Sequence, residues 1–483
     1  MSLFSRISRR STSSRVPPED RVPLLQKLAF SAGMNTEYIA TGLMMQVLWM
    51  PYFNIGLGIS PALLGLILMI LRAWDAITDP LIGNLSDNAR TRWGRRRPFM
   101  VVGAVATAAL YPLFWYVPMD MSETAKVTYL VGVGIVYFTF FTIWAMPYYG
   151  MQLELTPNYD ERTRLASWMA IFSKFSAFAG GWVMAFVTSS LFTNPETGKG
   201  DIVIGMKTAC WMIAGAILVF GLLPPLFVKE RYYNAEAKKQ PKQSFIQSIK
   251  DSARSKPLWS LIGVSFFLAF GYMSIGTLNQ YLNIYYVYGG DLSAASVLAG
   301  WRWTATVITG IIAIPAAAWL AERFDKKVMV IGTLVVGIIG VESNYFLMRP
   351  DMPYLQLIPG ILEVGAYSAM WLFLPSMKAD TADCDELDTG RRREGSINAF
   401  YSWFIKLSLT CAMGVGGLVL HLSGFDAKLG AQPPEVLSRM FTLYLILPVI
   451  IWGIAIVIAW YYPLNRQRMQ EVRDTLEARR GKI

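Results

Sequence analysis

The sequence predicts an all-α membrane protein with twelve transmembrane helices arranged as two six-helix bundles. Three observations lead to this fold class. The chain is 54% hydrophobic with a mean hydropathy of +0.38, which is too apolar for a soluble protein that must keep a polar surface. Twelve apolar runs are long enough to cross a bilayer, which needs about 20 residues each. A long polar segment divides these runs six and six.

The expected order begins with residues 1–27, which are basic and serine-rich without an apolar core and predict a cytoplasmic tail, not a signal peptide. The first bundle is expected at 28–228 and the second at 258–463, with a cytoplasmic tail at 464–483. The polar and basic segment 229–257 is expected to link the bundles in the cytoplasm. The expected spans lie near 28–54, 61–86, 98–118, 127–153, 164–190, 207–228, 258–286, 294–320, 328–347, 354–378, 395–422 and 438–463.

The distribution of basic residues predicts the orientation. Of the 44 Lys and Arg residues, about 34 lie in the tails and in the loops expected on the same side as the tails. We therefore expect both termini in the cytoplasm and the protein, as a monomer, in the cell's inner membrane. The net charge of +11 is explained by this bias and by anionic lipid headgroups, and does not indicate nucleic acid.

Several chemistries have no support in the sequence. Cys210, Cys384 and Cys411 show no CxxC spacing, so neither a disulfide framework nor a thiolate metal site is expected. The single histidine, His421, lies near the outer end of the eleventh span, which argues against a histidine proton relay. No Walker A loop, dinucleotide fingerprint or zinc motif occurs, so an ATP-driven pump or an enzyme is not expected.

Residues 64–98, LGLILMILRAWDAITDPLIGNLSDNARTRWGRRRP, place charges within an apolar helix. Asp75 and Asp79 are four residues apart and share one face, with Arg72 one turn earlier. A carboxylate at bilayer depth costs about 2.5–3.5 kcal/mol or more. Two such neighbours do not both ionise unless a cation enters or Arg72 neutralises them. The pattern predicts a cation site; the alternative is a structural ion pair of Arg72 with a spare carboxylate.

The segments RAWDAITDPLIG and TRWGRRRP resemble the second helix and following loop of the glycoside-pentoside-hexuronide:cation symporters, the melibiose permease family of the major facilitator superfamily. Two further segments resemble this family in the same order, PYYGMQLELTPNYDERTRLAS at 147–167 and MWLFLPSMKADTADCDELDTGRRREGSINAFYSWFIK at 370–406. The resemblance covers nearly the whole chain. It implies the major facilitator fold and symport of a sugar or glycoside with Na⁺, Li⁺ or H⁺, without another cofactor.

The expected cation ligands are all oxygen donors, as a hard monovalent ion prefers. They are Asp75, Thr78 and Asp79, with Thr142 added by the resemblance. Because the two threonines add neutral oxygens that a metal ion uses and a proton does not need, we expect sodium or lithium in preference to protons alone. Lys406 matches the family's buried lysine, which implies a link between the second bundle and these carboxylates.

The substrate site departs from the family's pattern. Glu37 and Tyr38 stand where the family has charged sugar ligands, and Ala145 and Ala170 stand where it has an aspartate and an arginine. Tyr149 replaces a tryptophan that stacks on the sugar ring, and a phenol still offers an aromatic face and a hydroxyl. The remaining expected substrate residues are Lys174, Trp371, Ser402 and Lys406.

Two bases decide the expected charge of the substrate. If Lys174 and Arg302 face the cavity, an anionic sugar such as a hexuronide is favoured. If they extend to the membrane interfaces, a neutral glycoside is expected. We expect this interfacial position for Arg302, and a neutral glycoside is our main prediction. A lysolipid-type carrier and a proton-coupled exporter are the alternatives. The polar NQYLN segment at 279–283 and the 398/402/406 stripe favour a polar substrate.

The expected cytoplasmic loops carry both signs of charge and predict a gate that closes when the cavity faces outward. The alternative is a solvated charged surface. The expected gating residues are Asp87, Arg95, Arg96, Glu154, Arg391 and Arg392.

Overall fold

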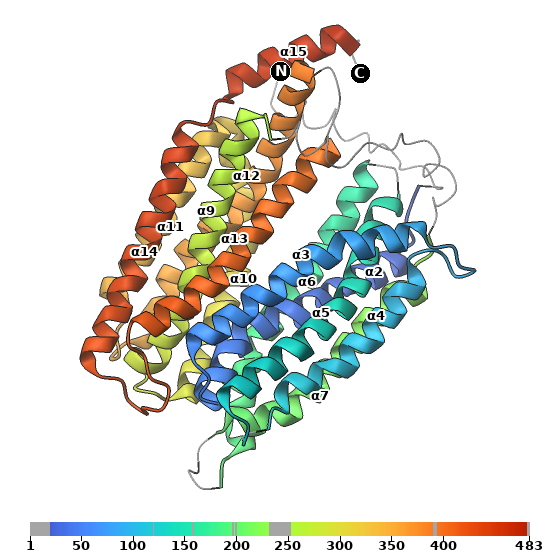
Figure 1. Cartoon of the computed structure of the whole chain (residues 1–483). Coiled ribbons are helices and arrows are strands. Elements are labelled where there is room, and N and C mark those ends of the chain that lie inside the picture. Colours follow the sequence, from blue (N-terminus) through green and yellow to red (C-terminus); the bar gives the residue numbers. More distant parts are fainter. Residues whose placement is uncertain are drawn as a thin grey trace.

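The computed structural model describes residues 20–118, 120–156, 159–195, 198, 200–230, 253–389 and 394–480. It is 84% helical, and its described residues include no strand, which confirms the all-α prediction (Figure 1). Arg391 and Arg392 lie outside the described residues. The description also leaves out the side chains of Glu154 and Trp371, which lie on described helices.

The N-terminal half of the molecule consists of the helices up to residue 227. They are α2 (Leu24–Glu37) with the π-helical segments η1 (Tyr38–Leu48) and η2 (Pro51–Gly56), α3 (Pro61–Asn88), α4 (Arg97–Leu110), η3 (Tyr111–Trp115), α5 (Glu123–Glu154), α6 (Tyr159–Val187), η4 (Ser190–Phe192) and α7 (Ile202–Phe227).

The C-terminal half begins at residue 256. It consists of α9 (Lys256–Leu282) continued by η5 (Asn283–Val287), α10 (Leu292–Arg323), α11 (Lys326–Leu347), η6 (Pro353–Gln356), α12 (Leu357–Thr389), α13 (Glu394–Leu422) and α14 (Pro434–Trp460). Helix α15 (Arg466–Arg480) lies across the end of this half (Figure 1). The helices alternate in direction. We call the side at which α2 begins and α14 ends the terminal side, and the opposite side the far side.

Nine helices of the described part are long and apolar enough to cross a membrane. They match nine of the twelve expected spans, so the chain is a multi-pass membrane protein. The spans expected near 28–54, 294–320 and 354–378 correspond to α2 with its π segments, α10 and α12. These three lie outside the nine, and the count of twelve stays a prediction.

Polar residues immediately before several helices explain where those helices begin. The Asp201 carboxylate accepts the N–H groups of Val203 and Ile204 at 2.7 and 3.3 Å, and Asp291 accepts the N–H of Ala294 at 3.0 Å. Such caps satisfy N–H groups that have no partner within the helix.

The N-terminal half is stabilised on the far side by an aromatic cluster. Phe53 stacks on Trp115 with ring centroids 5.6 Å apart, and the Tyr52 hydroxyl donates to the Trp115 carbonyl at 2.6 Å. Trp49 and Phe114 complete the cluster, and all five rings are fully buried. The cluster joins η2 to η3 and fixes the far-side end of this half.

The two halves meet through two helix pairs, α3 with α13 and α6 with α10. On the far side, α3 and α13 approach backbone to backbone. A Cβ atom added at Gly417 would lie 2.3 Å from the Pro61 carbonyl oxygen, and one at Gly65 would lie 3.0 Å from the Gly414 carbonyl oxygen. Glycine is therefore required at Gly417 for this approach.

Hydrogen bonds also join the halves on the far side. Tyr281 donates from its hydroxyl to Asn54 Oδ1 at 2.7 Å, Gln280 donates to the Val47 carbonyl at 3.1 Å, and Trp182 donates to Thr304 at 3.2 Å. The far side is thus closed between the halves.

We predict that Gly417→Ala weakens this far-side closure, because the new methyl group meets a backbone oxygen that cannot rotate away. Spin labels at the exposed far-side positions Leu191 and Tyr354, in a chain without native cysteines, should report a longer distance. Gly453→Ala is the matched control, since a Cβ there meets nothing within 4 Å. An unchanged distance in a folded Gly417→Ala protein would contradict the prediction.

Candidate functional site

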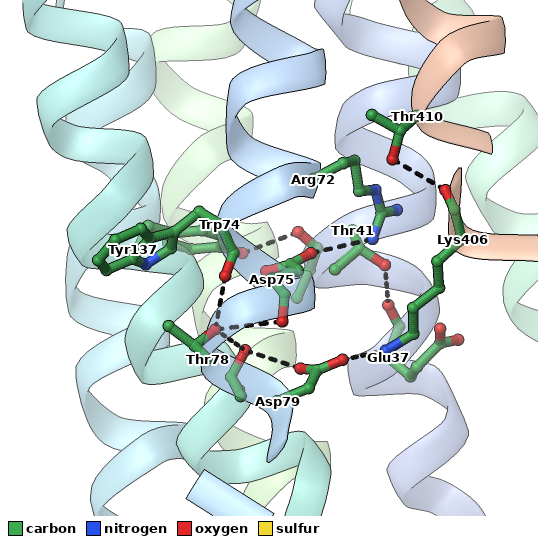
Figure 2. A network of polar contacts seen from close by, with 12 residues as sticks. Glu37, Thr41, Arg72, Trp74, Asp75, Thr78, Asp79, Tyr137, Lys406 and Thr410 are labelled. Carbon is green, nitrogen blue, oxygen red and sulfur yellow. Dashed lines mark hydrogen bonds and ion pairs between the residues drawn. The ribbon is translucent and has the colours of Figure 1, made fainter. Parts of the chain in front are cut away.

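The middle of α3 carries the charged residues of the candidate site (Figure 2). Helix α3 packs on α5 of its own half and on α13 of the other, so its polar face is enclosed. Pro80 lies within the helix next to Asp79. Because proline has no N–H, the carbonyl of Ala76 receives no intrahelical hydrogen bond from residue 80. This leaves a backbone oxygen between the two aspartates available to another partner.

Asp75 forms an ion pair with Arg72 one turn away. The distance between Arg72 Nη1 and Asp75 Oδ2 is 3.2 Å, and the Asp75 side chain is 10% exposed. The other carboxylate oxygen, Oδ1, is buried and has no hydrogen-bond partner. A buried carboxylate oxygen is costly without a partner, so this atom is a candidate ligand for a cation or a proton.

Asp79 joins the two halves. Lys406 of α13 donates from its ammonium group to Asp79 Oδ2 (Figure 2), and Thr142 of α5 donates to Oδ1 at 3.4 Å. Thr78 Oγ1 lies 3.4 Å from Thr142 Oγ1 and donates to the Trp74 carbonyl at 3.1 Å. The structure thus brings together Asp79, Thr78 and Thr142, with Asp75 one turn away.

Glu37 of α2 lies beside this group (Figure 2). Tyr149 is within hydrogen-bonding reach of its carboxylate, and the charge of Arg72 acts on Glu37 as well as on Asp75. The backbone carbonyl of Glu37 accepts a hydrogen bond from Thr41 at 2.8 Å. Arg72 forms its ion pair with Asp75, and it is near enough for its charge to act on Glu37 as well.

The charges of the site do not balance. Glu37, Asp75 and Asp79 are three carboxylates, and Arg72 and Lys406 are two bases. When all five groups are ionised, the site has one negative charge in excess. One monovalent cation or one proton would neutralise the site, and without it a net charge lies at membrane depth.

The remaining expected substrate residues are less closely grouped. Tyr38 packs its ring against Gly180 of α6, and its hydroxyl is buried without a partner. Lys174 of α6 is half-buried and has no ion pair among the described residues. Ser402 lies on α13 one turn before Lys406, half-buried, and Trp371 lies on α12.

The described gating residues contact one another within the N-terminal half. Arg96 pairs with Asp87 at 2.8 Å, and Arg95 donates to the Asp87 carbonyl at 3.3 Å. Glu230, which the sequence analysis missed, accepts the N–H groups of Arg95 and Arg96 at 3.1 and 2.9 Å. Gly94 permits this, since a Cβ there would lie 2.5 Å from the Glu230 carboxylate. A gating role across the halves stays a prediction.

A second acidic residue fixes the start of the chain on the terminal side. Glu161 pairs with Lys27 at 2.6 Å and accepts the N–H of Val22 at 2.9 Å. Burial alone would raise the pKa of Glu161, but the hydrogen bonds from Lys27 and Val22 outweigh it, and the pKa is lowered. No local sequence pattern indicates this pairing, because the partners are more than 130 residues apart.

The expectation that Arg302 reaches the outer membrane interface was wrong. Its guanidinium donates to Asn279 Oδ1 and lies close to Gly360. The reason is that α9 and α12 present polar groups to this position on α10. The signal was available, because Asn279 belongs to the NQYLN segment.

The described residues include no group of three or more His, Cys, Asp or Glu side chains that could hold a metal ion. The two aspartates with threonine and backbone oxygens form a different kind of donor set. Such a set suits a hard monovalent ion better than a transition metal.

The chain matches the family described as "MFS/sugar transport protein" over residues 30–466. The glucuronide carrier protein homolog of Escherichia coli is 24% identical and covers 89% of this chain and 90% of its own. The isoprimeverose transporter of Lactiplantibacillus pentosus is 24% identical, with 92% and 88% covered. The sodium-dependent lysophosphatidylcholine symporter 1 of Gallus gallus is 22% identical, with 95% and 90% covered.

Solved structures of the same fold are also similar. The crystal structure of a D-xylose-proton symporter aligns with a TM-score of 0.60 at 14% identity, covering 91% of this chain and 96% of its own. A bacterial homolog of the human lysosomal transporter Spinster, described as inward-facing and unoccupied, aligns with a TM-score of 0.64 at 13% identity, covering 96% and 98%. These likenesses support the fold.

We predict that Arg72→Gln lowers stability strongly, because it leaves Asp75 buried without its base; breaking a buried pair costs about 3–5 kcal/mol. Adding Asp75→Asn to this variant should restore part of the loss. Thermal unfolding in detergent measures both. The matched control is Arg349→Gln. Its ion pair with Asp351 is exposed, so its loss should leave the melting temperature unchanged. Equal melting temperatures for Arg72→Gln and Arg349→Gln would contradict the prediction.

Proposed function

Because the chain belongs to the MFS/sugar transport protein family, we propose that it is a cation-coupled symporter that carries a sugar or glycoside across the membrane by alternating access. Relatives named as an isoprimeverose transporter and a sodium-dependent lysophosphatidylcholine symporter support transport over enzymatic activity. The substrate and a co-transported cation are then its partners, together with membrane lipids.

The observation that carries the proposal is that three carboxylates, Glu37, Asp75 and Asp79, lie near only two bases, Arg72 and Lys406. When all five groups are ionised, one negative charge is left over. Without an added cation, moving this group between the two faces carries an uncompensated charge through a low-dielectric region, which is unfavourable. A bound cation cancels the charge and favours reorientation of the loaded protein. Cation binding is therefore coupled to reorientation of the protein through the charge that the cation cancels.

The ammonium group of Lys406 competes with a cation for the Asp79 carboxylate. This ammonium group binds Asp79 across the halves, next to the oxygens of Thr78 and Thr142 that a cation would use. A cation that binds Asp79 displaces the ammonium group, which changes a contact between the halves. The Lys406 side chain is 47% exposed, so it can turn toward an adjacent substrate.

The excess of basic residues on the terminal side supports a cytoplasmic location for that side in the cell's inner membrane. The far side then faces outward, and its contacts between the halves close the outer entrance. The Asp79–Lys406 pair joins the halves on the cytoplasmic side of these contacts. The protein needs no second copy to complete the site and is proposed to act as a monomer.

We propose sodium or lithium as the coupling ion. Thr78 and Thr142 hold neutral oxygens next to Asp79, and a metal ion gains from such ligands whereas a proton needs only one carboxylate oxygen. The unpartnered Asp75 Oδ1 is the atom that a proton would occupy in the alternative, proton-coupled mechanism.

A lysolipid carrier is the second candidate, favoured by the similarity to the Gallus gallus symporter. The polar groups of Glu37, Tyr149 and Lys406 support a polar substrate instead, because a carboxylate and an ammonium group bind hydroxyls well. Uptake of lysophosphatidylcholine and of glycosides by the same proteoliposomes separates the two candidates.

We predict that Asp79→Asn abolishes cation-driven accumulation of the sugar but keeps some downhill exchange. The change removes the charge that requires the ion and preserves the shape of the helix interface. Uptake against a gradient and counterflow in proteoliposomes measure the two activities. Asp351→Asn, on the exposed far side, is the control and should behave as the wild type. Undiminished uphill transport by Asp79→Asn would refute the cation-site assignment.

A further inference from the structure

We call the group of Glu37, Arg72, Asp75, Asp79 and Lys406 the charged centre. A cavity of about 220 Å³ lies between the halves on the far side of this centre. Its position follows from its lining. Leu68 lies one turn beyond Arg72 toward the far end of α3, and Met413 lies two turns beyond Lys406 toward the far end of α13. The cavity is therefore next to the candidate cation site but separate from it.

The two walls of the cavity differ in chemistry. The N-terminal half contributes mainly apolar side chains, among them Met45, Val47 and Leu68. The C-terminal half contributes polar groups from α9, α10, α12 and α14: Asn279, Gln280, Arg302, Glu363 and Tyr444. A ligand in this cavity meets most of its hydrogen-bonding partners on the wall of the C-terminal half, with Gln46 the polar residue of the other wall.

The polar wall is a connected network. Arg302 donates to Asn279 Oδ1, and Asn279 donates to the Tyr444 hydroxyl at 2.9 Å. Asn344 of α11 donates to the same hydroxyl at 3.1 Å and to Glu363 Oε1 at 3.3 Å. Glu363 is 7% exposed, and Asn344 and Tyr444 are fully buried. The network spans five helices, so the positions of its groups are fixed by the packing of the half.

The two charged groups of the network keep unused hydrogen-bonding capacity. No ion pair within 4.0 Å joins Arg302 to Glu363 in the described part of the chain, although the charge of Arg302 acts on Glu363. A guanidinium has five N–H donors and a carboxylate has about four acceptor positions, so one or two internal bonds leave several free. Ionisable groups at membrane depth mark substrate or ion sites by default.

The chemistry and size of the cavity fit one sugar ring. Each sugar hydroxyl both donates and accepts, which matches a wall that offers a guanidinium, a carboxylate and amides. The opposite charges of Arg302 and Glu363 balance, so the wall favours a neutral ligand over an anion. Sites for drug-sized ligands measure about 300–1,000 Å³, and this smaller cavity suits a monosaccharide unit.

We propose that this cavity is the binding site for a neutral sugar ring of the substrate, and that Asn279, Arg302 and Glu363 are its ligands. The inference rests on the proposed sugar transport and deepens it. The C-terminal half then supplies the base and the acid that the N-terminal half lacks at Ala170 and Ala145. An aglycone or second sugar would extend toward Tyr149 and Lys406.

A steric substitution tests the site without removing any polar group. Gly276 lines the cavity, and a Cβ added there meets nothing within 4 Å. Gly276→Leu should fill the cavity and abolish binding of methyl β-D-glucoside, methyl β-D-xyloside and methyl β-D-glucuronide, measured by calorimetry in nanodiscs with sodium. Gly332→Leu on α11 is the matched control, because its Cβ also meets nothing within 4 Å and it does not line the cavity.

A charge substitution tests the ligands. Glu363→Gln should weaken binding of the neutral glycosides about tenfold, the value for a lost hydrogen bond to a charged group. The same change leaves Arg302 unbalanced and should shift the preference toward the glucuronide. Glu435→Gln, in an exposed pair with Arg439 on α14, is the control and should change neither affinity.

The outcomes separate this inference from the proposed function. If the wild type binds a glycoside and neither Gly276→Leu nor Glu363→Gln changes the affinity, the cavity is not the sugar site, while the symport proposal stands. If the wild type binds none of the three glycosides in sodium, both proposals fail. Loss of binding in Gly276→Leu with unchanged sodium-dependent thermal stabilisation supports the site as described.

Discussion

The constraint on which the structure depends is the free-energy cost of carboxylates in the interior of a membrane protein. Each of them must be paired with a base or neutralised. Asp75 and Asp79 share one face of α3, and each has one base: Arg72 from the same helix and Lys406 from the opposite half. Glu37 adds a third carboxylate near Arg72. When all of these groups are ionised, one negative charge is left over, and this excess is the basis of the proposed cation coupling.

The halves divide the chemistry between them. The N-terminal half holds the three carboxylates and the threonines, whereas the C-terminal half contributes one ammonium group to the centre and a polar wall to the neighbouring cavity. The backbone contact of Gly417 with Pro61 closes the far side above that cavity. The candidate cation ligands of α3, the Lys406 contact and the far-side closure therefore lie on the same pair of helices, α3 and α13, next to the proposed sugar cavity.

Local sequence patterns were sufficient for features that lie on one helix. The i, i+4 spacing of Asp75 and Asp79 and the nine confirmed spans follow from periodicity and length, and the family followed from three motifs in order. The joint position of Thr142 and Lys406 near Asp79 was available only through the resemblance, because the partners are 63 and 327 residues away in sequence.

Features that depend on packing between distant helices could not be predicted in this way. Arg302 looked like an interfacial residue because its hydrogen-bond partner, Asn279, lies on another helix. Glu230 looked like a linker residue, yet it accepts the backbone N–H groups of Arg95 and Arg96. In both cases the sequence indicates a charged or polar residue but not the residue that it contacts, because that contact depends on how distant helices pack.

The central claim is that the charged centre takes up one monovalent cation for each substrate molecule. The most direct test is the charge moved per neutral glycoside, measured by electrical recording of proteoliposomes on a solid support together with radiolabelled uptake. At fixed pH with a sodium gradient, the account predicts one positive charge per glycoside, and no current without sodium or lithium. Glycoside transport without charge movement, or a current that depends on the proton gradient alone, would contradict it.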